Sequence, residues 1–348
     1  MSGSAFVASS AAQQAEPVES VRIERGELSV EFRDNSQSPA VLSGIDKLVN
    51  TTHAADYDAF DPDTGGASAG LNFEHIISGH RNPYNKFTPR HGPYTLRALA
   101  DGRTVVLTRR AEDSPWKVAS SLTYTVREPY YIDFEFRCTP HDASLFEPHG
   151  YAIFFFANYM NDVEDAALHF RGHTSTDTEE DWITADAPPG PPDWNGGGNY
   201  RALDAGRLQY DDDVEFRLNT WSYDRPRIAR PFYYGRAANG MTQILMFDRL
   251  SSERDQIRFS LYKFKLPKHP RPAWDFQYVI NKVETGADYG FRGRLVWKKF
   301  LSRRRLPERV RAMGRRFQDQ PAAAAGGTGS ATEAASPPCL RRVMLLLK

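Results

Sequence analysis

The stretch "VASSLTYTVREPYYIDFEFRC", residues 118–138, alternates apolar and polar side chains on both sides of a central "REP" turn. A two-residue period is typical of a half-buried β-strand, and a turn between two such runs predicts a hairpin. Two similar runs, "YTLRAL" (94–99) and "TVVLTRR" (104–110), precede it and are separated by the turn residues "ADG" and "AEDSP". We therefore expect an antiparallel meander with one buried face and one face in contact with water.

Strand patterns continue on both sides of this meander. "VRIERGELSVEFRD" (21–34) predicts a hairpin around a glycine turn, and "GYAIFFFANYM" (150–160) is apolar at successive positions, as in a central strand covered on both faces. Six further strand-like runs begin at residues 214, 230, 241, 256, 273 and 289. So many strands need at least two packed sheets, so the predicted fold class is all-β, a large antiparallel β-sandwich.

Composition changes at both ends of the strand-rich region. Residues 1–19 are predicted to be a flexible leader, and residues 20–300 a single β-sandwich domain. We expect a basic tail helix over 301–317 and a disordered, low-complexity tail over 318–348. Because the leader ends in small residues but has no long apolar core, the location is extracellular or periplasmic if it is a trimmed export signal, and otherwise cytoplasmic.

Charge and cysteine content exclude several classes of protein. The 44 lysines and arginines balance 44 aspartates and glutamates, which argues against a nucleic-acid partner, and no apolar run is long enough to span a membrane. Two cysteines support neither a disulfide framework nor a cysteine metal site. Nine histidines occur without an HExxH pattern, so no metal site or cofactor is predicted, although "DPDTGG" (61–66) leaves a structural cation open. The oligomeric state is undetermined.

A family resemblance rests on "SSLTYTVREPYYIDFEFRCTPHDAS" (120–144), which leads into "GYAIFFFANYMN" (150–161). A hairpin, a turn and a buried strand that ends in asparagine resemble the galactose mutarotase-like β-supersandwich of aldose 1-epimerases and of the central domain of several polysaccharide lyases. The resemblance covers roughly residues 20–300. It implies a cleft of the size of a sugar on a concave sheet, with a saccharide ligand.

The segment "NFEHIISGHRNPYNKFTPRHGP" (72–93) has no clear helix or strand period and is rich in histidine and arginine. Histidine can transfer a proton near neutral pH, and arginine can bind a carboxylate with two parallel hydrogen bonds. We expect His80 and His91 to be catalytic, and His75 and Arg90 to bind substrate. Strand alternation predicts that Glu74 points away from His75.

A second set lies in "LHFRGH" (168–173), where alternation places three polar side chains on one strand face. His169 is predicted to be catalytic, and Arg171 and His173 to bind substrate in the same cleft as the first set. The alternative is a polar strand face that is open to water.

A third set is aromatic. Trp194 and Tyr200 lie in the Pro/Gly-rich loop after residue 174, and "RPFYYGR" (230–236) contains Tyr234 and Arg236. Aromatic rings stack on sugars and arginines bond their polar groups, so Tyr234 is predicted to be catalytic and the other three to bind substrate. In "RPFYYGR" the adjacent tyrosines must point to opposite faces.

Three classes of function follow from these patterns. The first is a carbohydrate-active enzyme, an epimerase or a lyase, in which histidine or tyrosine transfers a proton and arginine stabilises charge. The alternatives are a non-catalytic saccharide-binding module and a structural or partner-binding β protein. No serine elbow, phosphate loop or dinucleotide motif favours another class of enzyme.

Overall fold

The computed structural model describes residues 15–36, 42–60, 70–85, 89–90, 92–186, 196–214, 224–263 and 271–302. Strand accounts for 58% of the described residues and helix for 4%, and no helix reaches seven residues. The predicted all-β antiparallel fold is therefore confirmed. Residues 1–14 of the leader and the predicted tail segments from residue 303 onward lie outside the described residues. No helix in the described part of the chain has the length and apolar character needed to cross a membrane.

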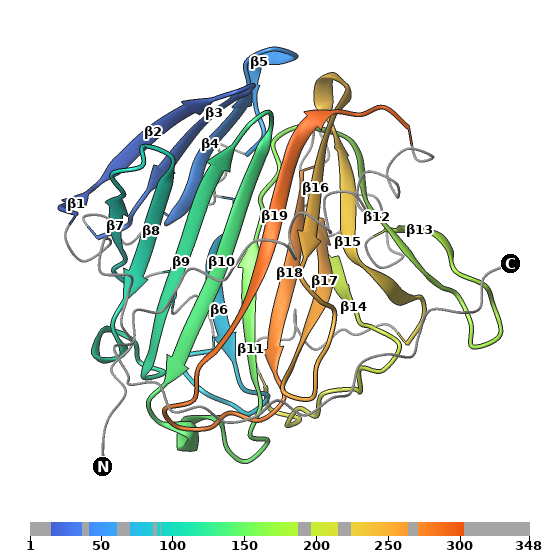
Figure 1. Cartoon of the computed structure of the whole chain (residues 1–348). Coiled ribbons are helices and arrows are strands. Elements are labelled where there is room, and N and C mark those ends of the chain that lie inside the picture. The colour runs from blue at the N-terminus through green and yellow to red at the C-terminus, as the bar shows by residue number, and fades with distance from the viewer. Residues whose placement is uncertain are drawn as a thin grey trace, which may run out of the picture.

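A ten-stranded sheet forms one layer of the molecule (Figure 1). In spatial order its strands are β1 (Pro17–Val18), β7 (Thr95–Ala98), β8 (Thr104–Arg109), β9 (Val118–Arg127), β10 (Tyr131–Pro140), β19 (Tyr289–Lys299), β16 (Met241–Phe247), β15 (Arg227–Ala237), β12 (Val163–His173) and β13 (Asp181–Ala185). Most of β9 and β10 comes from residues 118–138, the predicted hairpin. The two strands pair without interruption from Arg127 opposite Tyr131 to Val118 opposite Pro140.

Two smaller sheets lie behind the ten-stranded sheet in Figure 1. The five-stranded sheet contains β14 (Gly196–Tyr200), β17 (Asp255–Lys263), β18 (Pro272–Ile280), β11 (Ala152–Ala157) and β6 (Asn72–Ile77). The four-stranded sheet contains β2 (Ser20–Arg25), β3 (Leu28–Arg33), β4 (Gly44–Asn50) and β5 (Ala54–Asp58). Short 3-10 turns occur at η1 (Ala111–Asp113), η2 (Ala143–Phe146) and η4 (Ala238–Gly240). Every strand pair among the described residues is antiparallel.

An aromatic layer joins the ten-stranded and five-stranded sheets. Phe156 of β11 stacks on Phe276 of β18 with ring centroids 4.8 Å apart and planes within 4°. Phe136 of β10 meets Phe156 edge-on at 5.1 Å, and Phe291 of β19 does so at 5.4 Å. These rings belong to one buried hydrophobic cluster that extends from Ile23 to residues of β19 and draws on all three sheets. Tight packing of this kind fixes which face of each strand is turned inward.

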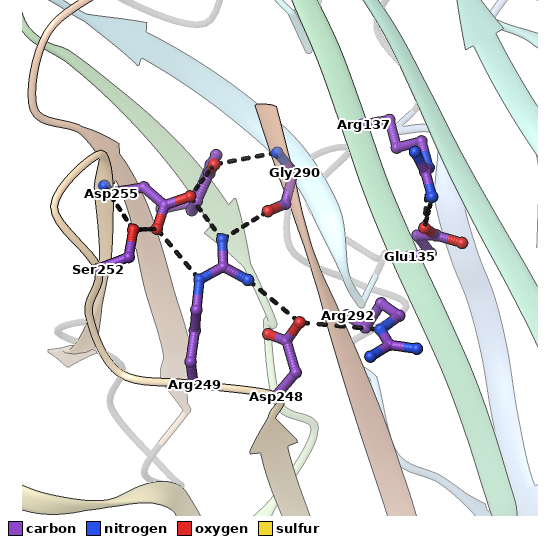
Figure 2. Close-up of polar contacts among 9 residues, drawn as sticks. Glu135, Arg137, Asp248, Arg249, Ser252, Asp255, Gly290 and Arg292 are labelled. Carbon is purple, nitrogen blue, oxygen red and sulfur yellow. Dashed lines mark hydrogen bonds and ion pairs between the residues drawn. The ribbon is translucent and has the colours of Figure 1, made fainter. Parts of the chain in front are cut away.

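A polar network ties the connection between β16 and β17 to the strands of both layers (Figure 2). Arg249 donates two hydrogen bonds to the Asp255 carboxylate, one to Asp248 at 3.1 Å and one to the Gly290 carbonyl at 2.8 Å. The Tyr278 hydroxyl donates to Asp255 at 2.7 Å. Because Asp255 lies on β17 and Gly290 on β19, the network joins the two sheets at their ends.

Replacing Phe156 with alanine removes the central ring of the aromatic layer and leaves a cavity between the sheets. We expect the Phe156→Ala variant to lose about 3–5 kcal/mol of unfolding free energy, measured by urea denaturation. Leu301→Ala, at a side chain that is 51% exposed, is the control and should change it by less than about 0.5 kcal/mol. Equal effects of the two substitutions would contradict the importance of this layer.

Candidate functional site

The strands of the five-stranded sheet carry aromatic residues on one face and polar residues on the other. In β18, Phe276 points into the aromatic layer, so its neighbours Asp275 and Gln277 point to the opposite face. Register extends this face across the sheet, because Asp275 pairs with Ser260 and Ser260 pairs with Asn199. We call this surface the polar face; its members include Asn72, His75, Asn199, Arg258, Ser260, Asp275 and Gln277, and all are buried.

A β-bulge places Glu74 on the polar face. His75 pairs with Phe155 and Phe73 pairs with the next residue, Phe156, so Glu74 is the extra residue of β6. The Nε2 atom of His75 lies 3.3 Å from Oε2 of Glu74. The prediction from strand alternation that Glu74 points away from His75 is therefore wrong, because alternation fails where a bulge adds a residue.

Glu74 is the centre of a buried cluster of charged and polar groups. The Tyr159 hydroxyl donates to Oε1 of Glu74 at 2.5 Å, and Nη1 of Arg90 donates to the same oxygen at 2.7 Å. Burial alone would raise the pKa of the Glu74 carboxyl, but His75, Arg90 and Tyr159 outweigh burial and hold the pKa below its usual value. Glu74 is thus ionised at neutral pH.

Asp275 behaves in the opposite way. Burial raises the pKa of the Asp275 carboxyl well above its usual value, and the negative charge of Glu74 adds to this effect. A hydrogen bond of 2.8 Å from the Asn158 backbone amide to Oδ1 opposes the rise without cancelling it. The raised pKa favours the protonated form of Asp275, which can donate a proton or a hydrogen bond.

Tyr159 and Asn72 complete the cluster. Burial raises the pKa of the Tyr159 hydroxyl well above its usual value, and the negative charge of Glu74 raises it further, so the tyrosine stays protonated. Asn72 lies at the edge of the polar face opposite Ala157 and is fully buried. Both polar atoms of its side chain lack a hydrogen-bond partner among the described residues. A buried, unpartnered amide is unusual and points to a polar ligand.

His80 lies away from this cluster, beyond the end of β6. Its Nδ1 atom is 2.8 Å from the Ser78 hydroxyl. Burial lowers its pKa, the nearby Asp211 raises it, and His149 lowers it. Leu208 and Tyr210 pack against the neighbouring apolar positions Ile77, Ile153 and Val279.

The second predicted set lies on the outer face of the ten-stranded sheet. His169 of β12 stacks on Tyr234 of β15 at 4.8 Å, and its Nε2 atom is 2.9 Å from Asp165. Arg171 pairs with Glu180 at 2.8 Å. Arg236 pairs with Glu164, and His173 is a half-buried residue whose Nδ1 atom contacts the Thr178 carbonyl. As predicted, Tyr233 and Tyr234 point to opposite faces, since the Tyr233 hydroxyl reaches the Trp274 carbonyl in the core.

The structure does not bring the predicted residues into one cleft. His75 and Arg90 join Glu74 at the polar face, whereas His169, Arg171 and Tyr234 lie beyond both sheets on the opposite side of the core. Tyr200 packs against Phe170 and Phe259 in the core. His91 and Trp194 lie outside the described residues. The predicted convergence is therefore wrong, because it assumed that two separate loops meet on one sheet, while the catalytic and binding roles stay predictions.

The sequence patterns did not identify Asp275 or Tyr159 as site residues, and they did not predict the contact between Glu74 and His75. A signal for Asp275 is present in "AWDFQYV" (273–279), where an acidic residue lies in a strand whose other residues, apart from Gln277, are apolar. A charged side chain on a strand that is buried on both faces must have a partner or a function. In the described part of the chain, no group of three or more His, Cys, Asp or Glu side chains is placed to hold a metal ion.

Comparisons with known proteins were made for the whole chain. No protein-family model matches it, and no curated protein matches it. The structure is similar to the galactosidase domain of an α-galactosidase–sucrose kinase, at 10% identity and a TM-score of 0.41, over 80% of this chain and 40% of that one. It is similar to a heparan sulfate lyase mutant from Pedobacter heparinus, at 8% identity and a TM-score of 0.41, over 81% of this chain and 35% of that one.

A third solved structure is a GalM/aldose epimerase homologue from C. elegans, at 11% identity and a TM-score of 0.41, over 81% of this chain and all of that one. The chain thus spans less than half the length of the first two proteins. At this level of similarity, the assignment of a function depends on the geometry of the site.

Proposed function

We propose that this chain is a carbohydrate-active enzyme, an epimerase or a lyase, that binds a saccharide at the polar face and transfers a proton there. The observation that carries the proposal is that two buried carboxyl groups on one sheet face, Glu74 and Asp275, have surroundings that lower the pKa of the first and raise the pKa of the second. Pairs of carboxyl groups whose surroundings separate their pKa values are typical of acid–base catalysis.

The composition of the polar face suits a polyhydroxylated ligand. Asn72, Asn199, Gln277 and Ser260 supply amide and hydroxyl groups that can donate and accept hydrogen bonds. Phe155 lies on the same face between His75 and Gln277, and an aromatic ring can stack on the apolar side of a sugar. Few other ligand classes need both kinds of contact at one site.

The two carboxyl groups are separated by a distance that one sugar ring can span. Glu74 lies on β6 and Asp275 on β18, and both strands pair with β11, so their backbones are about 10 Å apart. Their side chains extend from the same face and influence each other's charge. A ligand between them would contact a proton acceptor on one side and a proton donor on the other.

The residues have distinct roles in this proposal. Glu74 accepts a proton, directly or through the Tyr159 hydroxyl that donates to it, and Asp275 supplies a proton to the opposite side of the ligand. Arg90 and His75 hold Glu74 in place and balance its charge. In this proposal Arg90 positions the base. The sequence had instead predicted that Arg90 binds the substrate. Burial of the cluster keeps water from these groups and strengthens their electrostatic effect.

A panel of substrates separates the two reactions. The protein is incubated with neutral aldoses, whose interconversion is followed by polarimetry, and with uronic acid polysaccharides, whose cleavage produces an ultraviolet band of unsaturated products. Turnover in either arm supports the proposal and identifies the reaction. Saccharide binding without turnover would instead indicate a non-catalytic binding module, and no binding in either arm would contradict the proposal.

Asp275→Asn tests the role of the neutral acid. Asparagine retains the shape, the acceptor for the Asn158 amide and a hydrogen-bond donor, but it cannot release a proton. We expect turnover to fall roughly 10²- to 10⁴-fold while substrate affinity changes little. Asp248→Asn is the matched control, because burial also raises the pKa of Asp248 but the residue lies in the Arg249 network. An equal loss of turnover in both variants would assign Asp275 a structural role.

The raised pKa of Asp275 also predicts how stability depends on pH. The folded state holds a proton that the unfolded state releases above the ordinary carboxyl pKa, so unfolding free energy falls as pH rises toward the raised pKa. From about pH 5 upward, we expect the stability of the wild type relative to Asp275→Asn to fall as pH rises, by up to about 1.4 kcal/mol per pH unit. Urea denaturation across this range measures it.

Glu128→Gln, at a side chain that is 64% exposed, is the control for the pH series and should leave the slope of the wild type unchanged. An identical slope in the wild type and in Asp275→Asn would show that Asp275 does not hold the proton in the folded state.

A further inference from the structure

Arginines gather around residues 202–207, at the end of β14 and away from Glu74 and Asp275. Arg227 donates from Nη1 to the carbonyl oxygens of Ala202 and Ala205, at 3.1 Å and 2.8 Å. Arg258 donates from Nη2 to the Gly206 carbonyl at 2.8 Å and from Nε to the Gln256 amide oxygen at 3.0 Å. Two arginines thus hold this segment through neutral oxygens, which do not balance their charge.

One carboxylate, Asp224, serves the other arginines of the group. Arg201 donates from Nη2 to Oδ1 of Asp224 at 2.7 Å, and Arg207 donates from Nε to the same oxygen at 3.0 Å and from Nη2 to Oδ2. Arg227 reaches only the backbone carbonyl of Asp224, at 2.7 Å. We call Arg201, Arg207, Arg227 and Arg258 the arginine cluster.

The arginines of the cluster also lower one another's pKa values. Burial lowers the pKa of Arg258 to about 10, and the positive charges of Arg201 and Arg227 contribute to the decrease. Burial and then Arg201 lower the pKa of Arg227 in the same way. All of these groups remain protonated at neutral pH, so the fold keeps several cations close together at a cost in free energy that a bound anion would offset.

A cavity of about 280 Å³ adjoins the cluster. Its lining includes Gly206, Arg207, Ser251, Ser252, Gln256 and Asn281. Arg207 contributes a side chain that is 65% exposed, and Arg258 lies directly behind two lining residues, Gly206 and Gln256, to which it is hydrogen-bonded. Asp204 also lines the cavity, where its carboxylate accepts a hydrogen bond from Ser251 at 2.7 Å.

We propose that this cavity is a binding site for a small oxyanion, with Arg207 as the direct ligand and the rest of the arginine cluster as the source of positive potential. The guanidinium of Arg207 can release Asp224 and form parallel hydrogen bonds to a carboxylate, sulfate or phosphate group, while serine hydroxyls and amides of the lining satisfy the remaining oxygens.

The site is separate from the proposed catalytic groups. Gln256 and Ser260 lie four residues apart on β17, which places the cavity about 13 Å along the strand from the residue that pairs with Asp275. The inference therefore stands independently of the proposed catalytic function. Its ligand is a free inorganic oxyanion or the anionic group of a sugar.

Isothermal titration calorimetry at constant ionic strength tests the site with sodium sulfate, sodium phosphate and sodium glucuronate, and with glucose as the uncharged probe. We expect at least one oxyanion to give a binding isotherm with the wild type. Glucose, which carries no charge, should give none at this site. Binding of glucuronate alone identifies an anionic sugar as the ligand, and binding of sulfate or phosphate identifies an inorganic ion. Absence of binding by all three oxyanions overturns the proposal.

Two variants give effects of opposite sign. Arg207→Gln removes the direct ligand and should weaken oxyanion binding at least about 10-fold, as expected for the loss of a charge-assisted hydrogen bond. Asp224→Asn removes the carboxylate that competes for Arg207 and should strengthen binding several-fold. A decrease or no change in Asp224→Asn, or unchanged affinity in Arg207→Gln, would contradict the assignment.

Arg230→Gln is the matched control. Arg230 is 60% exposed and pairs with both oxygens of Glu180, as Arg207 pairs with both oxygens of Asp224, but it lies on the ten-stranded sheet. Its oxyanion affinity should equal that of the wild type. A loss as large as that in Arg207→Gln would show that the effect comes from net charge alone and would overturn the site. Far-ultraviolet circular dichroism confirms that each variant is folded.

Discussion

The aromatic layer between the two large sheets is the constraint on which the rest of the structure depends. Phe156 and Phe276 stack across β11 and β18, and Phe136 and Phe291 close over them from the ten-stranded sheet. Because successive residues of a strand point to opposite faces, burying these rings turns the residues between them outward. The polar face of the five-stranded sheet is the direct consequence, and its geometry is as rigid as the aromatic packing beneath it.

Burial of the polar face determines the protonation of its groups. A buried carboxylate is stable only with partners, and Glu74 has them in Arg90, His75 and Tyr159. Asp275 accepts a hydrogen bond from a backbone amide, but burial outweighs this bond and raises the pKa of its carboxyl group. The surroundings of the two carboxyl groups thus shift their pKa values in opposite directions, which is the property that connects the fold to the proposed proton transfer.

Arginine has contrasting uses in different parts of the molecule. On the ten-stranded sheet, Arg171 and Arg230 bond to Glu180, and Arg294 pairs with Asp133, so each of these arginines has a carboxylate partner. In the arginine cluster, Arg227 and Arg258 bond to neutral oxygens beside a polar cavity. Guanidinium groups held by neutral oxygens keep a positive potential, which is the basis of the proposed oxyanion site.

The sequence by itself determined the all-β fold, the β9–β10 hairpin, and the opposite directions of Tyr233 and Tyr234, because alternation and turn residues are local signals. Only the tertiary structure decided which sheet each strand joins and which side chains share a sheet face. It separated His169 from His75 by the whole core, used a bulge to bring Glu74 beside His75, and placed Asp275 on the same face. These outcomes depend on register and on contacts between strands far apart in the chain, which a period of two residues does not encode.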